Sequence, residues 1–264
     1  MHCRFSGVWH LAVLMIVAAP AVAAPAEDIL VERGAEVYAT YCQGCHGADG
    51  NGHGPAAEML IVKPRDFTKG VFKFRSTPTG ELPTTADLYR TITNGAYGTS
   101  MPSWSLLTER ERYAVIEFIK GFYPGWKTDG PGNPIYIPRA PAWVGSEKSV
   151  ARGREIYELL SCRQCHGAGG RGDGPSAADL EPDIWGNPQK PFDFTRGHLK
   201  GGPDVEDIYR TFMTGIGGTA MPSFAGIFDE VDNEYIFKGD AWNLVSYVLS
   251  LRRGRSERGE HASR

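Results

Sequence analysis

Two short clusters of cysteine and histidine are the residues of this sequence best suited to do chemistry. They are Cys42-x-x-Cys45-His46 and Cys162-x-x-Cys165-His166. Residues three and four positions apart share a face of a helical turn, so each unit presents two thiols and an imidazole in one direction. Such a unit is suited to zinc, to a redox disulfide or to a covalently attached haem.

A methionine follows each histidine at the same distance. Met101 lies 55 residues after His46, and Met221 lies 55 residues after His166. Both occur in the pattern G-T-[SA]-M-P-S-[WF], in which the proline pushes the methionine away from helical geometry. A thioether on such a loop is a suitable second axial ligand for an iron that the histidine binds from the other side.

Covalent haem explains these residues better than the alternatives. Structural zinc takes four N, S or O ligands, whereas each half clusters only three. A thioredoxin-like pair is expected in a βαβ setting, and structural disulfides leave the following histidines unexplained. We therefore expect two covalently attached haem c groups, held by all four cysteines. The predicted iron ligands are His46, Met101, His166 and Met221.

The sequence segments that position these groups occur twice in the chain. The stretch "RGAEVYATYCQGCHG" is repeated as "RGREIYELLSCRQCHG", and "DLYRTITNGAYGTSMPSW" is repeated as "DIYRTFMTGIGGTAMPSF". The second copy has seven extra residues around "EPDIWGN", and the first copy has seven extra residues within "KFRSTPTGE". The distance from histidine to methionine is therefore the same in both copies. Apolar residues recur with helical spacing near 34–41, after Thr108 and after Asp240, and no convincing alternating strands are present. The pattern predicts an all-α fold.

The domain organisation follows from the repeat. We expect helical domains at residues 24–123 and 149–253, each wrapped around one haem. A proline-rich linker at 124–148 joins them, because proline at this density does not continue a helix. Residues 254–264 lack apolar side chains and are expected to form a disordered tail.

The first 23 residues have the composition of a signal peptide. Arg4 precedes the apolar stretch "VWHLAVLMIVAA", and "AVAA" offers a cleavage site after Ala23. The alternative is an uncleaved membrane anchor, although the apolar run is shorter than the ~20 residues of a spanning helix. Cleavage also removes Cys3, and we expect the exported protein to reside in the bacterial periplasm.

The composition is that of an ordinary globular protein. The chain of 264 residues is 41% hydrophobic and 22% charged, with a formal net charge of −3. This charge is too small to indicate a nucleic-acid partner.

The haem motifs and their methionines closely resemble the class I c-type cytochromes, duplicated as a diheme protein. The resemblance implies an N-terminal helix that crosses a C-terminal helix in each domain. It also implies that Pro55 and Pro175 offer a backbone carbonyl to the haem-binding histidines. The segment "KPRDFTKGVFKFRSTPTGELPT" resembles diheme cytochromes that accompany bacterial respiratory oxidoreductases. Its arginines, Arg65 and Arg75, are candidates for haem propionates, with surface arginines as the alternative.

The residues predict an electron carrier rather than an enzyme. An iron held by both histidine and methionine has no position open for a substrate. The expected partners are a respiratory oxidoreductase, another cytochrome or a terminal oxidase, with membrane association only if the N-terminal segment is uncleaved. We expect the protein to act as a subunit of an oxidoreductase or as a shuttle for one. The alternative is a haem enzyme of the diheme peroxidase or thiosulfate-oxidising type, which needs one iron with an exchangeable position.

Overall fold

The computed structural model describes residues 26–197, 199–229, 236 and 239–260, so the predicted leader at 1–23 lies outside the described residues. The helices are α1 Ala26–Tyr41, α2 Gln43–His46, the 3-10 helix η1 Ala57–Met59, α3 Thr85–Asn94, α4 Glu109–Lys120, α5 Gly125–Thr128, α6 Glu147–Leu159, α7 Cys162–His166, α8 Val205–Thr214, α9 Ala225–Asp229 and α10 Asp240–Glu260. The described residues contain no β-strand, and the all-α prediction is confirmed.

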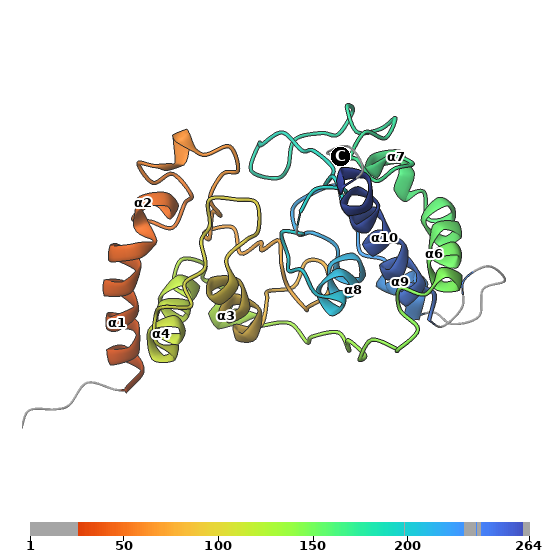
Figure 1. The fold of residues 1–264 in the computed structure, drawn as a ribbon. Coiled ribbons are helices and arrows are strands. Elements are labelled where there is room, and N and C mark those ends of the chain that lie inside the picture. Colours follow the sequence, from red (N-terminus) through yellow and green to blue (C-terminus); the bar gives the residue numbers. More distant parts are fainter. Residues whose placement is uncertain (1–25, 198, 230–235, 237–238, 261–264) are drawn as a thin grey trace, which may run out of the picture.

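The first repeat is built on the close contact of α1 with α4 (Figure 1). Gly34 of α1 lies so near α4 that a Cβ atom there would collide with the carbonyl oxygen of Ala114. α3 packs beside this pair and completes one apolar cluster. The buried members are Val37, Tyr38, Phe67, Phe72, Leu88, Ile92, Val115, Ile116 and Ile119.

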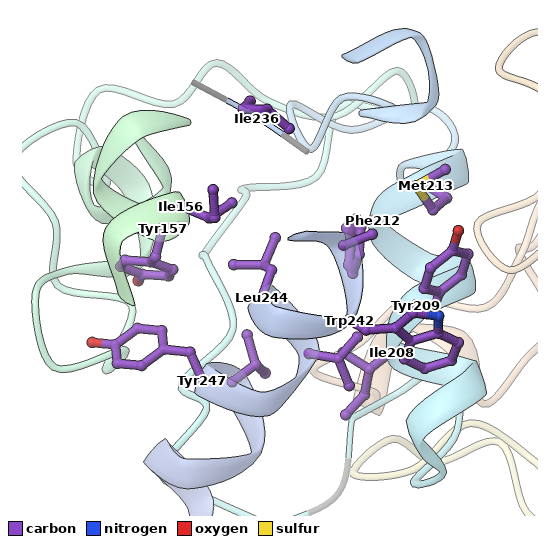
Figure 2. Close-up of a cluster of buried hydrophobic side chains, with 13 residues drawn as sticks. Ile156, Tyr157, Ile208, Tyr209, Phe212, Met213, Ile236, Trp242, Leu244 and Tyr247 are labelled. Carbon is purple, nitrogen blue, oxygen red and sulfur yellow. The ribbon is translucent and has the colours of Figure 1, made fainter. Parts of the chain in front are cut away.

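The second repeat copies this arrangement with α6, α10 and α8. A Cβ atom at Gly153 of α6 would collide with the carbonyl oxygen of Asn243 in α10. Figure 2 shows side chains from the three helices converging on one core. Within it, the Tyr209 ring stacks on Trp242 with ring centroids 4.5 Å apart. The expected pairing of an N-terminal with a C-terminal helix is therefore present in both repeats.

Local sequence signals begin these helices. Thr84 starts α3, and its hydroxyl accepts a hydrogen bond from the Asp87 amide while the Asp87 carboxylate binds back to the Thr84 amide. Thr108 and Glu111 form an equivalent pair of hydrogen bonds, a capping box, at the start of α4. Such caps satisfy amides that have no partner within the helix and are each worth about 1 kcal/mol.

The second repeat holds one extra residue between its first helix and its cysteines. Cys42 lies four positions after Tyr38, whereas Cys162 lies five positions after Tyr157. The structure absorbs the difference at Ser161, which has a φ of 58°. Among the described residues, Ser161 alone combines a positive φ with a side chain. This left-handed residue ends α6 and allows α7 to start at Cys162 in the register of the first repeat.

The predicted linker lies along both repeats (Figure 1). It starts with the short helix α5 and then continues through residues 130–141 without regular structure. The Ile135 amide donates to the carbonyl oxygen of Ser76 at 2.7 Å in the first repeat, and the Ala140 amide donates to Glu206 Oε1 at 3.3 Å in the second. The linker is thus attached to both domains.

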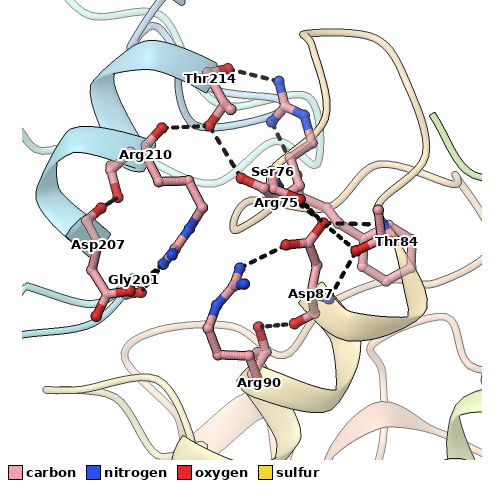
Figure 3. A network of polar contacts seen from close by, with 12 residues as sticks. Arg75, Ser76, Thr84, Asp87, Arg90, Gly201, Asp207, Arg210 and Thr214 are labelled. Atoms are coloured by element: carbon pink, nitrogen blue, oxygen red, sulfur yellow. Dashed lines mark hydrogen bonds and ion pairs between the residues drawn. The ribbon is translucent and has the colours of Figure 1, made fainter. Parts of the chain in front are cut away.

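The two repeats also contact each other directly through the end of α8. Figure 3 shows the Arg75 guanidinium pointing at Thr214, where Nη2 donates to the carbonyl oxygen at 2.8 Å. The Thr79 hydroxyl donates to the same oxygen at 3.0 Å, and the Thr214 hydroxyl returns a hydrogen bond to the Arg75 carbonyl at 3.3 Å. Arg75 is only 2% exposed, so the interface is dry at this point.

The C-terminal helix is longer than the sequence predicts. α10 continues to Glu260, so residues 254–260 are helical where a disordered tail was expected, and 261–264 lie outside the described part of the chain. Once packing has formed the first turns of a helix, each further residue adds a hydrogen bond at little cost. Within the described ranges, no helix is both long and apolar enough to cross a membrane.

Candidate haem-binding sites

A short helical turn presents the cysteines and the histidine in each repeat. In the first, the His46 amide donates to the Cys42 carbonyl oxygen at 2.9 Å, which fixes the spacing of the motif. α7 covers the whole motif of the second repeat. The four cysteines of the described chain form no disulfide. Burial raises the pKa of Cys42 and Cys162 to about 12, so both are neutral thiols at neutral pH.

A backbone carbonyl orients each histidine. His46 Nδ1 lies 3.0 Å from the carbonyl oxygen of Arg65, and His166 Nδ1 lies 3.2 Å from that of Phe192. A carbonyl oxygen only accepts hydrogen bonds, so Nδ1 carries the proton and Nε2 presents its lone pair. Burial lowers the pKa of both histidines, which favours this neutral form. The arrangement is typical of an imidazole held ready for a metal.

These carbonyls correct the expectation for Pro55 and Pro175. Both prolines are exposed, and the histidine contacts come from Arg65 and Phe192 instead. The turn that carries Pro55 is tied to the back of the cysteine motif, because the Ala56 amide donates to the carbonyl oxygen of Gly44 at 2.9 Å. The shared pattern K-P-x-D-F-T at 63–68 and 190–195 is the sequence signal that marks the actual acceptors.

An aromatic ring supports each histidine from the same pattern. Phe67 stacks on His46 with centroids 4.6 Å apart, and Phe194 stacks on His166 at 4.5 Å. The interplanar angles are 19° and 22°. Although both phenylalanines are visible in the repeat, sequence reasoning assigned them no role. The stacking restricts rotation of each imidazole about its own axis.

The first methionine loop is a closed turn held by its own threonine. The Ala96 amide donates to the Met101 carbonyl oxygen at 3.1 Å, and the Met101 amide donates to Thr99 Oγ1 at 3.1 Å. The Ser103 hydroxyl then ties the loop to the carbonyl oxygen of Thr93 in α3 at 2.6 Å. Met101 packs against the same apolar cluster as Cys42.

The second loop repeats these bonds one for one. The Ile216 amide donates to the Met221 carbonyl oxygen at 3.1 Å, and the Met221 amide donates to Thr219 Oγ1 at 3.2 Å. The Ser223 hydroxyl ties the loop to the carbonyl oxygen of Met213 in α8. Met221 and Cys162 pack against one cluster. Each repeat thus brings the first cysteine of its motif and its methionine to one core, and the histidine stacks on a phenylalanine that belongs to or packs against that core.

The surroundings of the two methionine loops differ. Gly217 of the second loop is buried, and a Cβ atom there would collide with the carbonyl oxygen of Phe72 in the first repeat. Gly98 of the first loop is exposed, with no described atom within 4 Å of such a Cβ. The second methionine loop therefore packs against the first domain at Gly217, whereas Gly98 of the first loop has no such neighbour.

The two arginines proposed for propionates have different surroundings. The Arg75 guanidinium already binds the carbonyl oxygens of Pro78 and Thr214, so it does not fit the expected role. The Arg65 guanidinium instead lies over the ring of Trp185, with Cζ 3.6 Å from the ring centroid. Burial lowers the pKa of Arg65 to about 10, which leaves it charged at neutral pH.

The donor set of each repeat fits haem c. Two thiols are available for thioether bonds, an imidazole presents Nε2, and a thioether lies on a fixed loop. The indole Nε1 atoms of Trp126 and Trp185 are buried without an acceptor among the described residues, as expected beside a group that carries carboxylates. The residues that would hold the cofactor are Cys42, Cys45, His46 and Met101 in the first repeat and Cys162, Cys165, His166 and Met221 in the second.

Comparison with known proteins gives the same result. Residues 30–119 match the family of cytochrome c oxidase, cbb3-type, subunit III, and residues 150–252 match the cytochrome c family. A chain of the reducing HAO-like protein complex of Kuenenia stuttgartiensis is 42% identical, with a TM-score of 0.75 over 83% of this chain and 96% of that one. No curated protein matches the sequence.

The fold and the sites define a diheme c-type cytochrome. The chain belongs to the cytochrome c family and consists of two class I cytochrome c domains in tandem. Each domain binds one haem c covalently, and this class of protein transfers electrons.

Proposed function

We propose that this protein is exported to the periplasm and carries electrons between respiratory redox proteins, as a subunit of an oxidoreductase or a shuttle for one. Bound haem c supplies reversible one-electron exchange at its iron. The residues of this chain fix the ligands, exclude water from the metal and determine the reduction potential.

The observation that carries the proposal is the agreement between the two methionine loops. Met101 and Met221 are held by equivalent hydrogen bonds from Thr99 and Thr219. If Met101 and Met221 bound the irons together with His46 and His166, both irons would be closed to substrates, which would favour electron exchange over catalysis. Neither loop shows a departure that would free a coordination position.

The comparisons support the proposed type of partner. The 42% identical chain belongs to a reducing HAO-like protein complex, and the family of the first domain is named for a subunit of an oxidase. A native-size measurement of the protein from its own cells distinguishes the two forms of the proposal. A subunit elutes with a larger redox enzyme, whereas a shuttle elutes alone.

Carbon monoxide tests whether both irons are closed. We expect no carbon monoxide spectrum from the reduced wild-type holoprotein, and one reactive haem in Met101→Ala or Met221→Ala. Met59→Ala is the matched control, because Met59 is 80% exposed and lies outside both sites. Binding of carbon monoxide by one haem of the wild type would contradict the electron-carrier proposal and favour the peroxidase or thiosulfate-oxidising alternative.

Export is tested on the mature chain. When expressed with its own leader in a bacterium that matures c-type cytochromes, the periplasmic protein is expected to begin at Ala24. Retention of residues 1–23 in the membrane fraction would contradict cleavage and favour the anchor.

A further inference from the structure

One matched position carries different side chains in the two repeats, although its backbone plays the same role in both. Residue 65 and residue 192 both supply the carbonyl that holds a histidine, but their side chains are arginine and phenylalanine. The second repeat also carries the seven extra residues around "EPDIWGN", which include Asp183 and Trp185. The structure brings these two differences together at the domain interface.

Arg65 contacts both domains through different groups. Its carbonyl oxygen lies 3.0 Å from His46 Nδ1 in the first domain. Its guanidinium Cζ lies 3.6 Å from the centroid of the Trp185 ring in the second. Stacking of a guanidinium on an aromatic face is favourable, and both Arg65 and Trp185 are partly buried here.

Trp185 in turn lies against the loop of the second methionine. A Cβ atom at Gly218 would meet the Trp185 ring, and the neighbouring Ile184 amide donates to the Gly218 carbonyl oxygen at 3.1 Å. Gly218 is three residues before Met221, whose amide binds the intervening Thr219. A continuous set of contacts therefore connects the histidine of the first haem to the methionine of the second.

A buried carboxylate fixes the position of Trp185. Asp183 is 7% exposed, and its Oδ1 accepts hydrogen bonds from the amides of Trp185 at 3.1 Å and Asn187 at 2.9 Å. Its Oδ2 accepts from Lys73 Nζ of the first domain at 3.1 Å. The extra residues of the second repeat thus form a rigid turn that is tied across the interface.

We propose that Arg65 is a positioning residue that links the two haem sites, so that its contact with Trp185 sets the potential of the second haem as well as the first. The inference rests on the proposed electron-transfer function of both sites. A buried cation stabilises reduced iron relative to oxidised iron and raises its potential, because the reduced form carries less positive charge. Arg65 extends this effect from the domain that contains it to the domain that it contacts. No bond is made or broken, and one haem is oxidised as the other is reduced.

Arg65→Met tests the link on the holoprotein. This substitution removes the charge and the planar group but keeps the backbone carbonyl that holds His46. The methionine methyl signals of the two iron sites, assigned in NMR spectra with Met101→Ala and Met221→Ala, report the redox state of each haem separately. We expect the reduction equilibrium of the Met221 haem to fall about tenfold, or about 59 mV for a one-electron couple, relative to a fixed reference.

Two further variants separate charge from stacking. Arg65→Lys keeps the charge and is expected to restore part of the potential. Trp185→Phe is expected to lower the potential of the Met221 haem, and the double variant with Arg65→Met is expected to show no larger shift than the stronger single variant. Thr79→Val is the control, because it removes an interface hydroxyl that does not touch the Arg65–Trp185 pair.

The outcomes distinguish this inference from the proposed function. If both haems keep their methionines and Arg65→Met changes the potential of the His46 haem only, the proposed link between the sites is wrong. The proposed electron-transfer function is then unaffected. Additive shifts in the double variant, or equal shifts in Thr79→Val, also overturn the link. If the wild type lacks one methionine-bound haem, the proposed function itself fails.

Discussion

The Tyr38 hydroxyl donates a hydrogen bond of 2.7 Å to the carbonyl oxygen of Gly47, the residue that follows His46. Tyr157 makes the same bond to Gly167 at 2.8 Å in the second domain. Both tyrosines are buried, and burial raises the pKa of each phenol, so each remains a donor throughout the physiological range. The first helix of each domain is thereby attached to the histidine turn.

Tyr38→Phe is expected to destabilise the holoprotein by about 1 kcal/mol, because the buried Gly47 carbonyl oxygen loses this hydrogen bond and keeps only the one from the Gly50 amide at 3.3 Å. Denaturant unfolding, followed by circular dichroism, measures the loss. Tyr136→Phe is the control, since Tyr136 is 83% exposed. An unchanged midpoint in Tyr38→Phe would show that the hydrogen bond contributes nothing to the attachment.

Gly153→Ala is expected to destabilise the second domain by about 3 kcal/mol or more, because the added methyl group collides with the backbone of α10. Thermal unfolding of the holoprotein measures the effect. Gly226→Ala in α9 adds the same methyl group in open space and is expected to leave the melting temperature nearly unchanged. Equal effects of the two substitutions would refute the close helix contact.

Asp87→Asn is expected to cost about 2–3 kcal/mol at neutral pH, because the completely buried carboxylate of Asp87 accepts hydrogen bonds from Ser76, Thr84 and Arg90. Burial alone would raise the pKa of Asp87, but these hydrogen bonds and the charge of Arg90 lower it overall. A carboxyl group with a lowered folded-state pKa stabilises the protein fully above its unfolded pKa.

That stabilisation is lost as the pH falls through the folded-state pKa. The difference in unfolding free energy between the wild type and Asp87→Asn is therefore expected to shrink in acid, below about pH 4. Unfolding titrations across this range measure the difference. Asp129→Asn, at an exposed position, controls for the change in net charge. A difference that stays constant into acid would contradict the account.

The sequence predicted the parts of this protein that are repeated and periodic. The cysteine motifs, the methionines at equal distance and the helices after Thr108 and Asp240 follow from spacing alone. The carbonyls of Arg65 and Phe192 did not, because any residue has a carbonyl and only the folded chain shows which one reaches a histidine. Phe67 and Phe194 were detectable in principle, since they occupy matched places in the repeat.

Contacts between the domains were beyond prediction for a different reason. Arg65 and Trp185 are 120 positions apart and belong to segments that the other repeat lacks or changes. Arg75 was expected to bind propionates, but a guanidinium also binds carbonyl oxygens, and those of Thr214 and Pro78 lie within reach. Residues 254–260 are helical as the continuation of α10, which composition alone does not reveal.

The optical spectrum of the oxidised holoprotein tests the central claim that both irons are held by histidine and methionine. The weak far-red band that arises from methionine bound to oxidised iron is compared among the wild type, Met101→Ala and Met221→Ala. Each variant is expected to lose about half of the band, because each methionine closes one iron. A wild-type band from one haem only, with the other iron high-spin or bound by two histidines, would contradict the carrier and indicate a haem enzyme.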